Sequence, residues 1–122
     1  MTGYKLLDSS VWIAYFTKQM HFSLIESGRD IIISSLSFFE VGKKLLIDKI
    51  PRKVVQEHLK FMQTHASTIE VTFNIVEQAI EVSLNHNLAM ADSIIYSSAL
   101  LNKAELITLD NDFRGLPNTL IL

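Results

Sequence analysis

The stretch YKLLDSS, residues 4–10, sets the pattern on which the whole chain is built. Its apolar run predicts a short buried strand, and Ser9 and Ser10 are good N-caps for a helix that begins directly after it. Asp8 therefore stands at the carboxyl end of a strand. In a parallel sheet such strand ends lie along one edge, where α/β folds build their sites.

Strand and helix signals alternate along the rest of the chain, with no linker, repeat or low-complexity segment between them. Apolar runs predict strands at 31–34, 106–108 and 119–121, and a short strand or extended link at 69–71. Helices are predicted at 9–16, 21–27, 37–48, 51–65, 72–85 and 91–102; in the fifth, the apolar residues at helical spacing are Phe73, Val76, Ile80 and Leu84. This alternation predicts an α/β fold, a parallel sheet with helices on both faces, in one domain of residues 1–122.

Composition excludes several classes of protein. The apolar fraction of 48% is ample for a core, and the absence of cysteine rules out disulfides and thiolate metal sites. No apolar run approaches the roughly 18 residues of a membrane span, and the N-terminus lacks a signal peptide's apolar stretch. We therefore expect a cytoplasmic protein with no membrane partner. The net charge of −2 does not favour nucleic-acid binding, but two bound divalent cations would reverse its sign.

Five acidic residues adjoin the predicted elements, and together they suggest a site. They are Asp8, Glu40, Asp92, Asp110 and Asp112. Acids that are distant in sequence meet if the carboxyl ends of their strands share one edge. A carboxylate cluster of that kind repels itself unless it binds cations.

Each acid also has a purely structural interpretation. Asp8 can be a turn residue or a helix cap, and Ser37 with Glu40 matches a capping box in which Glu40 occupies the third helical position. The helix dipole favours an acid such as Asp92 in a first turn, and residues 110–112 have an ordinary loop composition. Taken singly, most of the acids are explained in this way. Their joint placement on elements that converge is explained poorly.

Four stretches resemble the motifs of PIN-domain ribonucleases, most closely the VapC toxins of prokaryotic toxin–antitoxin pairs. They are LLDSSVWI at 6–13, ISSLSFFEVG at 33–42, LAMADSIIYSSA at 88–99 and LITLDNDF at 106–113. The resemblance covers the chain from end to end, with the motifs in order and at family spacing. It implies a PIN-like α/β fold with a protruding helical hairpin and a metal-dependent endoribonuclease that is inhibited by a VapB-like antitoxin.

The resemblance also assigns roles to particular residues. The acidic positions of the family fall on Asp8, Glu40, Asp92 and Asp110. The metal ligands would be Asp8, Asp92, Asp110 and Asp112, and the small hydroxyl positions beside the site would be Ser9 and Thr108. Glu40 either orients a water molecule or ligates directly. The cofactor would be Mg²⁺ or Mn²⁺, because these ions prefer carboxylate oxygens and divalent ions promote phosphodiester cleavage.

The predicted hairpin of the helices at 37–48 and 51–65 carries both charge and apolar surface. Its cations form either a solvated helix end or a basic rim for RNA phosphates: Lys43, Lys44, Lys49, Arg52 and Lys53. Its apolar residues exceed what one face of a small sheet covers. By resemblance, the hairpin would grip the antitoxin and contribute near a homodimer contact. The aromatic residues Trp12, Phe16, Phe38 and Phe39 are interpreted as core or interface.

Three alternatives remain at this stage. One is a PIN nuclease of RNA processing or decay, and another is a catalytically silent PIN-like interaction module. The third, from a different class, is a receiver-like signalling domain, which also places acids at strand ends. Against it, Ser9 follows Asp8 where such domains have a second acid, and no lysine follows the final strand.

Overall fold

Five parallel strands form the sheet in the computed structural model, which describes residues 3–122. They are β1 (Tyr4–Leu7), β2 (Ile31–Ser34), β3 (Ser67–Ile69), β4 (Ala104–Thr108) and β5 (Thr119–Ile121). The strand order is β3-β2-β1-β4-β5, and each neighbouring pair is parallel. The predicted α/β fold is confirmed.

The strand order places a switch point in the middle of the sheet. The chain moves outward from β1 through β2 to β3, and then returns to lay β4 on the other side of β1. Open α/β sheets bind ligands outside the carboxyl ends of the strands at such a point. Receiver-like domains have the order 2-1-3-4-5 instead. The receiver alternative is therefore wrong.

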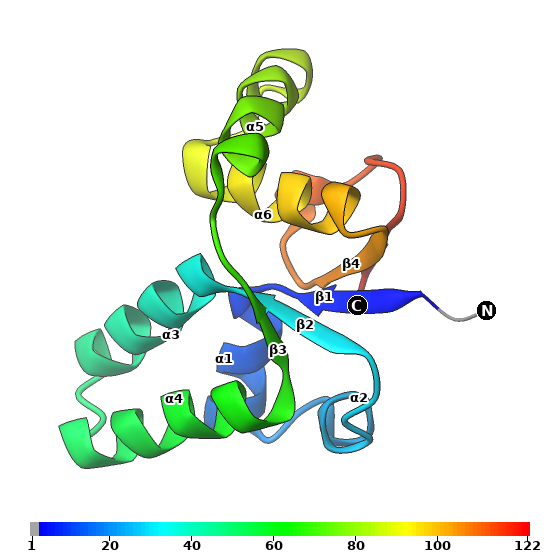
Figure 1. The fold of residues 1–122 in the computed structure, drawn as a ribbon. Helices are drawn as coiled ribbons and strands as arrows, with labels where there is room; N and C mark the ends of the chain where they lie inside the picture. The colour runs from blue at the N-terminus through cyan, green and yellow to red at the C-terminus, as the bar shows by residue number, and fades with distance from the viewer. Residues whose placement is uncertain (1–2) are drawn as a thin grey trace.

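Helices cover both faces of the sheet (Figure 1). One face is covered by α1 (Ser9–Lys18), α2 (Phe22–Glu26), α3 (Ser35–Ile47) and α4 (Arg52–His65), and the other by α5 (Phe73–His86) and α6 (Met90–Leu101). Successive residues of a strand point to opposite faces of the sheet. Leu7 and Ile107 pack into the first core, under α1 to α4, whereas Leu6 and Leu106 pack into the second core, under α5 and α6. Among residues 3–122, no helix is both long and apolar enough to cross a bilayer.

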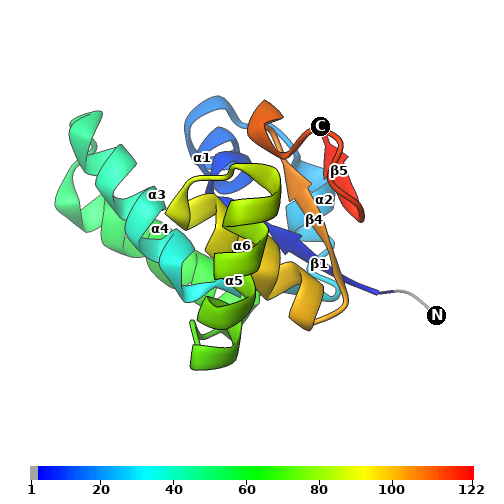
Figure 2. The same ribbon diagram turned by 90° about the horizontal axis from the view of Figure 1, so that it is seen from above.

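Helices α3 and α4 form the predicted hairpin, which projects to one side of the sheet when the molecule is seen from above (Figure 2). Most apolar residues of the hairpin pack into or against the first core. Val41, Leu45, Val55 and Met62 are buried in the first core together with Trp12 of α1.

The helix caps differ from the predicted ones. The N-cap of α1 is Asp8, whose carboxylate accepts from the Ser10 backbone N–H, and neither serine caps the helix. The N-cap of α3 is Ser34, whose hydroxyl accepts from the Leu36 N–H. The helix therefore begins two residues earlier than predicted and Ser37 is buried within it. The capping box is wrong, because Glu40 lies in the second turn, where it cannot cap the helix.

Two other predictions shift. The third strand occupies Ser67–Ile69, because Ala66 is already extended directly after α4 and the pairing of β2 with β3 starts at Ser67. In α5 the residues that face the core are Ile75, Ala79 and Val82. The large apolar residues whose spacing predicted this helix are exposed: Phe73, Val76, Ile80 and Leu84.

Candidate active site

Asp8 occupies the centre of the candidate site, at the end of the central strand β1. It is buried, and its two carboxylate oxygens have different partners. Oδ1 accepts from the backbone N–H and the hydroxyl of Ser10, and Oδ2 accepts from the Thr108 hydroxyl at 2.7 Å. Burial raises the pKa of Asp8, and the hydrogen bonds from Ser10 and Thr108 oppose that rise. The side chain is thus fixed in position by the elements on either side of it.

The two hydroxyls connect Asp8 to the end of β4. The Ser10 hydroxyl accepts from the Leu109 N–H, and the Thr108 hydroxyl accepts from the Asp110 N–H, both at 2.9 Å. Each hydroxyl therefore accepts from the backbone beyond β4 and donates to the carboxylate. Hydrogen bonds that are linked in such a chain polarise and so strengthen one another in a low-dielectric environment. Thr108 lies beside the acids as predicted, whereas the sequence suggests only a capping role for Ser10.

Glu40 approaches the site from α3. The side chain is half-buried, and its carboxylate accepts a hydrogen bond from the Ser9 hydroxyl. Burial raises its pKa most, the Ser9 bond lowers it, and the neighbouring charge of Asp8 raises it again. Ser9 thus forms a hydrogen bond with Glu40, and Thr108 forms one with Asp8. Glu40 lies close enough to Asp8 for the charge of Asp8 to raise its pKa.

Asp92, Asp110 and Asp112 form the tightest part of the cluster. One carboxylate oxygen of each lies within 4.8 Å of those of the other two. Asp92 lies in the first turn of α6, and Asp110 caps the short 3₁₀ helix Asn111–Phe113 by accepting from the Asp112 N–H at 2.9 Å. Burial followed by the charges of Asp110, Asp112, Glu40 and Asp8 raises the pKa of Asp92 to about 6. All five predicted acids therefore interact within one region.

The donor set suits a hard divalent cation. Ligand oxygens around one Mg²⁺ ion stand about 3–4 Å apart, given Mg–O distances of about 2.1 Å. The carboxylate oxygens of the trio all lie within 4.8 Å of one another, so at most small side-chain movements bring them into that range. The ligands are carboxylates alone, which suits Mg²⁺ or Mn²⁺ better than softer metals. Asp8 lies beside the trio, outside the set of closest oxygens.

The predicted basic residues lie elsewhere on the molecule. Lys43 and Lys44 are exposed on α3, and Lys49, Arg52 and Lys53 are exposed around the turn to α4. Since the hairpin projects from the sheet, the residues of this turn lie at its outer end (Figure 1). Lys44 pairs with Asp48 at 3.3 Å, and Lys43 lies over the ring of Phe39, 5.7 Å from its centroid.

Comparisons with known proteins agree with the fold. The family model of the PIN domain matches residues 5–118. A toxin–antitoxin complex from Klebsiella pneumoniae contains a similar chain, with a TM-score of 0.79, 23% identity and 95% of both chains covered. VapBC2 from Rickettsia felis, bound to a DNA fragment from its promoter, aligns with a TM-score of 0.78 and 18% identity over 98% of this chain and 97% of that one.

A further similar structure is VapC20 from Mycobacterium tuberculosis, described as a sarcin–ricin loop cleaving toxin. Its TM-score is 0.73 at 14% identity, and the alignment covers 93% of this chain and 95% of that one. No curated protein matches the sequence. At these identities the solved structures establish a shared fold, while the family model covers nearly all of the sequence. The chain therefore belongs to the PIN domain family.

Proposed function

We propose that residues 1–122 form a single metal-dependent endoribonuclease domain and that the protein is the toxin of a VapBC-type toxin–antitoxin pair. The observation that carries the proposal is the convergence of Asp8, Glu40, Asp92, Asp110 and Asp112 at the carboxyl edge of a PIN-family sheet. The similar structures from K. pneumoniae, R. felis and M. tuberculosis support the toxin assignment.

In this proposal Asp92, Asp110 and Asp112 hold Mg²⁺ or Mn²⁺ together with Asp8. When bound, such an ion lowers the pKa of a water molecule and neutralises charge that develops on the phosphate and the leaving oxygen. Ser10 and Thr108 keep Asp8 from rotating and favour its charged form. Ser9 holds the carboxylate of Glu40 in place.

Glu40 orients the attacking water and accepts its proton. A carboxylate whose pKa is raised by burial is a better proton acceptor than an exposed one, as general-base catalysis requires. The water then attacks phosphorus in line with the leaving oxygen of the RNA chain. The exposed cations of the α3–α4 hairpin would contact phosphates farther along that chain.

The proposed partners are RNA, a VapB-like antitoxin and a second copy of the chain, in the cytoplasm. The antitoxin would insert an arginine or lysine into the acidic site, pair with Asp8, Glu40 or Asp92, and displace the metal. Its apolar flank would lie beside α3. A basic side chain suits a site whose acids raise one another's pKa.

A cleavage assay on single-stranded RNA tests the enzymatic proposal. We expect cleavage that requires Mg²⁺ or Mn²⁺, stops on chelation, and is lost in Asp8→Asn and Asp92→Asn, which nearly preserve volume. The matched control is Glu81→Gln, an exposed acid of α5 that should retain full activity. Full activity of either site variant in the presence of metal would refute the assignment.

A further inference from the structure

An exposed aromatic ring lies next to the acidic cluster on α3. Phe39 directly precedes Glu40 in the second turn of the helix, and its side chain is 64% exposed. The sequence predicts a core or interface position for this ring, and its exposure excludes the core. Phe38, by contrast, packs against the first core. The proposed mechanism gives Phe39 no role, although leaving a phenylalanine ring in water is unfavourable.

Lys43 lies between this ring and the active site. Its ammonium stands over the Phe39 ring, 5.7 Å from the centroid, within the range of a cation–π contact. With 3.6 residues per turn, Lys43 projects about 40° from the direction of Phe39 and about 60° from that of Glu40, between the two. Residues three apart on a helix have Cβ atoms about 5–6 Å apart, so the Lys43 side chain begins one turn from Glu40.

The positive charge of Lys43 is available to an anion. In the part of the chain that the structure describes, the one ion pair joins Lys44 to Asp48 at 3.3 Å, and the exposed Lys43 ammonium has no carboxylate partner. The other predicted cations of the hairpin start at Lys49, toward its outer end (Figure 1). Lys43 is therefore the unpaired cation of the hairpin that is closest to Glu40 along the chain.

We propose that Phe39 and Lys43 form a nucleotide subsite next to the acidic cluster, in which an unpaired base of the RNA stacks on the Phe39 ring and Lys43 binds a neighbouring phosphate. Proteins hold single strands by these two means, stacking on aromatic rings and contact of cations with phosphates. A base inside a duplex has its faces covered by its neighbours, so the subsite selects unpaired RNA. This inference rests on the proposed ribonuclease function and deepens it.

The subsite positions the RNA and takes no part in breaking the bond. A base held on Phe39 fixes the nucleotide next to the phosphate that the water oriented by Glu40 attacks. Holding a substrate in a reactive geometry lowers the barrier, because the entropy of ordering is lost on binding and not in the transition state. The ring is exposed in the free protein because its partner is the substrate.

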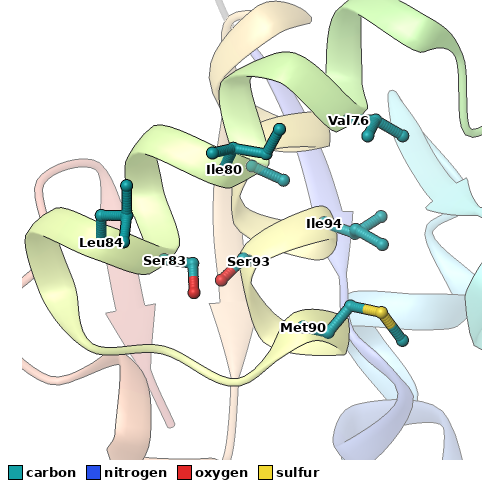
Figure 3. A pocket seen from close by; sticks show the side chains of 8 residues that line it. Val76, Ile80, Ser83, Leu84, Met90, Ser93 and Ile94 are labelled. Atoms are coloured by element: carbon teal, nitrogen blue, oxygen red, sulfur yellow. The ribbon is translucent and has the colours of Figure 1, made fainter.

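A second exposed apolar surface does not combine these features. It lines a groove of about 480 Å³ between α5 and α6, with Ile80 and Leu84 on one side and Met90 on the other (Figure 3). The sequence has no lysine or arginine between Lys60 and Lys103, a stretch that contains both helices. A phosphate in this groove would meet no cation on either helix, so the chemistry of RNA favours α3.

Fluorescence of 2-aminopurine tests the stacking directly, because this base is quenched when it stacks on an aromatic ring. The probe is a single-stranded uridine octamer with 2-aminopurine near its middle, bound by the inactive Asp92→Asn protein in Mg²⁺. We expect quenching on binding. Adding Phe39→Leu should abolish the quenching and weaken binding by about 5- to 100-fold, whereas Phe39→Trp should preserve both.

Two controls separate stacking from folding and from general attraction. Phe73→Leu is the matched variant, because Phe73 is 73% exposed on α5, a helix without cations, and its loss should leave the affinity unchanged. An octamer of abasic sugar phosphates keeps the charge but offers no base. Phe39→Leu should not weaken the binding of that octamer, whereas Lys43→Ala should. Circular dichroism confirms that each variant is folded.

Several outcomes would overturn the subsite. Quenching that persists in Phe39→Leu, or equal losses of affinity in Phe39→Leu and Phe73→Leu, refutes stacking on this ring. Unchanged kcat/KM for RNA in the otherwise wild-type Phe39→Leu enzyme refutes the subsite and leaves the nuclease proposal intact, whereas a wild type that does not cleave RNA refutes both. If Phe39→Leu binds RNA normally but loses a co-expressed antitoxin, the ring belongs to the antitoxin interface.

Discussion

The Thr108 hydroxyl donates to Asp8 Oδ2 over 2.7 Å and joins two residues that are 100 positions apart in the chain. The same hydroxyl accepts from the Asp110 N–H, so one buried oxygen fixes the position of two acids. Both partners depend on it, because the buried Oδ2 of Asp8 and the partly buried N–H of Asp110 would otherwise lack this hydrogen bond.

Thr108→Val therefore tests whether the Thr108 hydroxyl holds Asp8 and Asp110 in position. The substitution keeps the shape of the side chain but removes its donor and acceptor, which should cost about 1–3 kcal/mol of stability. We expect the melting temperature to fall by roughly 4–12 °C and RNA cleavage to decrease. Thr64→Val is the matched control, since that exposed hydroxyl bonds only locally to the Phe61 carbonyl and His65. Equal losses in both variants would contradict a special role for Thr108.

Metal binding should be visible as stabilisation of the folded protein. Without metal the acids repel one another, so Asp92→Asn should raise the melting temperature of the metal-free protein. In wild type, Mg²⁺ or Mn²⁺ at about 10 mM should raise it by roughly 4 °C or more, because only the folded state offers the site. Asp92→Asn and Asp112→Asn should lose that rise, while Glu81→Gln keeps it. An unchanged wild-type melting temperature would count against a preformed metal site.

The pH dependence of metal-free stability follows from Asp92. Its folded pKa of about 6 lies above the ordinary 3.8, so the folded chain binds this proton more tightly than the unfolded chain does. The free energy of unfolding should therefore fall as pH rises from about 4 to about 6, by on the order of 1 kcal/mol after allowance for solvent exposure. Urea denaturation at several pH values measures this. Asp92→Asn should show a smaller fall, and an equal one would assign the effect to other groups.

RNA contact by the hairpin is tested through salt dependence. Each cation that meets a phosphate of a single strand contributes about 0.7 to the slope of log binding constant against log salt concentration. Lys43→Ala should reduce the slope by about that amount, measured in the inactive Asp92→Asn background. Lys44→Ala should have a smaller effect, because Lys44 is already paired with Asp48. Lys18→Ala, on α1, is the control, and an equal loss there would indicate nonspecific attraction.

Inhibition by the proposed antitoxin should compete with metal. If a basic side chain replaces the cation, then raising the concentration of Mg²⁺ or Mn²⁺ should weaken inhibition. Replacing the inserted residue of the antitoxin should restore cleavage without abolishing binding. An inhibited complex that retains its metal would instead favour a block of the path that RNA follows.

Much of the fold could be predicted because local apolar runs identify buried strands. The run at residues 31–34 needed no tertiary information, and parallel strands bring their carboxyl ends together in any open α/β sheet. That rule placed Asp8 and Asp110 near each other from sequence alone. The same reasoning included Glu40 and Asp92, which adjoin other predicted elements, and the resemblance to PIN domains then assigned all four acids to the acidic positions of the family.

Other features depend on contacts that no local pattern contains. The sequence suggests only a local capping role for Ser10, which the structure gives to Asp8 instead, and the hydrogen bond from the Leu109 N–H to the Ser10 hydroxyl forms only because β1 and β4 are adjacent. Two sets of apolar residues in α5 have helical spacing, and the prediction of this helix rests on the set with the larger side chains. The buried face is instead the one with Ala79, Ile75 and Val82. Helix α6 has small buried residues, Ser93, Ser97 and Ser98, and the two helices pack closely. Spacing alone does not reveal which face is buried.

The pairing of β1 with β4 also determines when the acidic cluster can exist during synthesis of the chain. Asp8 emerges from the ribosome first, but the hydroxyl of Thr108 and the carboxylates of Asp110 and Asp112 follow 100 or more residues later. A nascent chain that stops before β4 lacks the pairing of β1 with β4 and two of the four proposed metal ligands, Asp110 and Asp112. The proposed nuclease domain would thus stay inactive until β4 and the acidic residues that follow it have been translated.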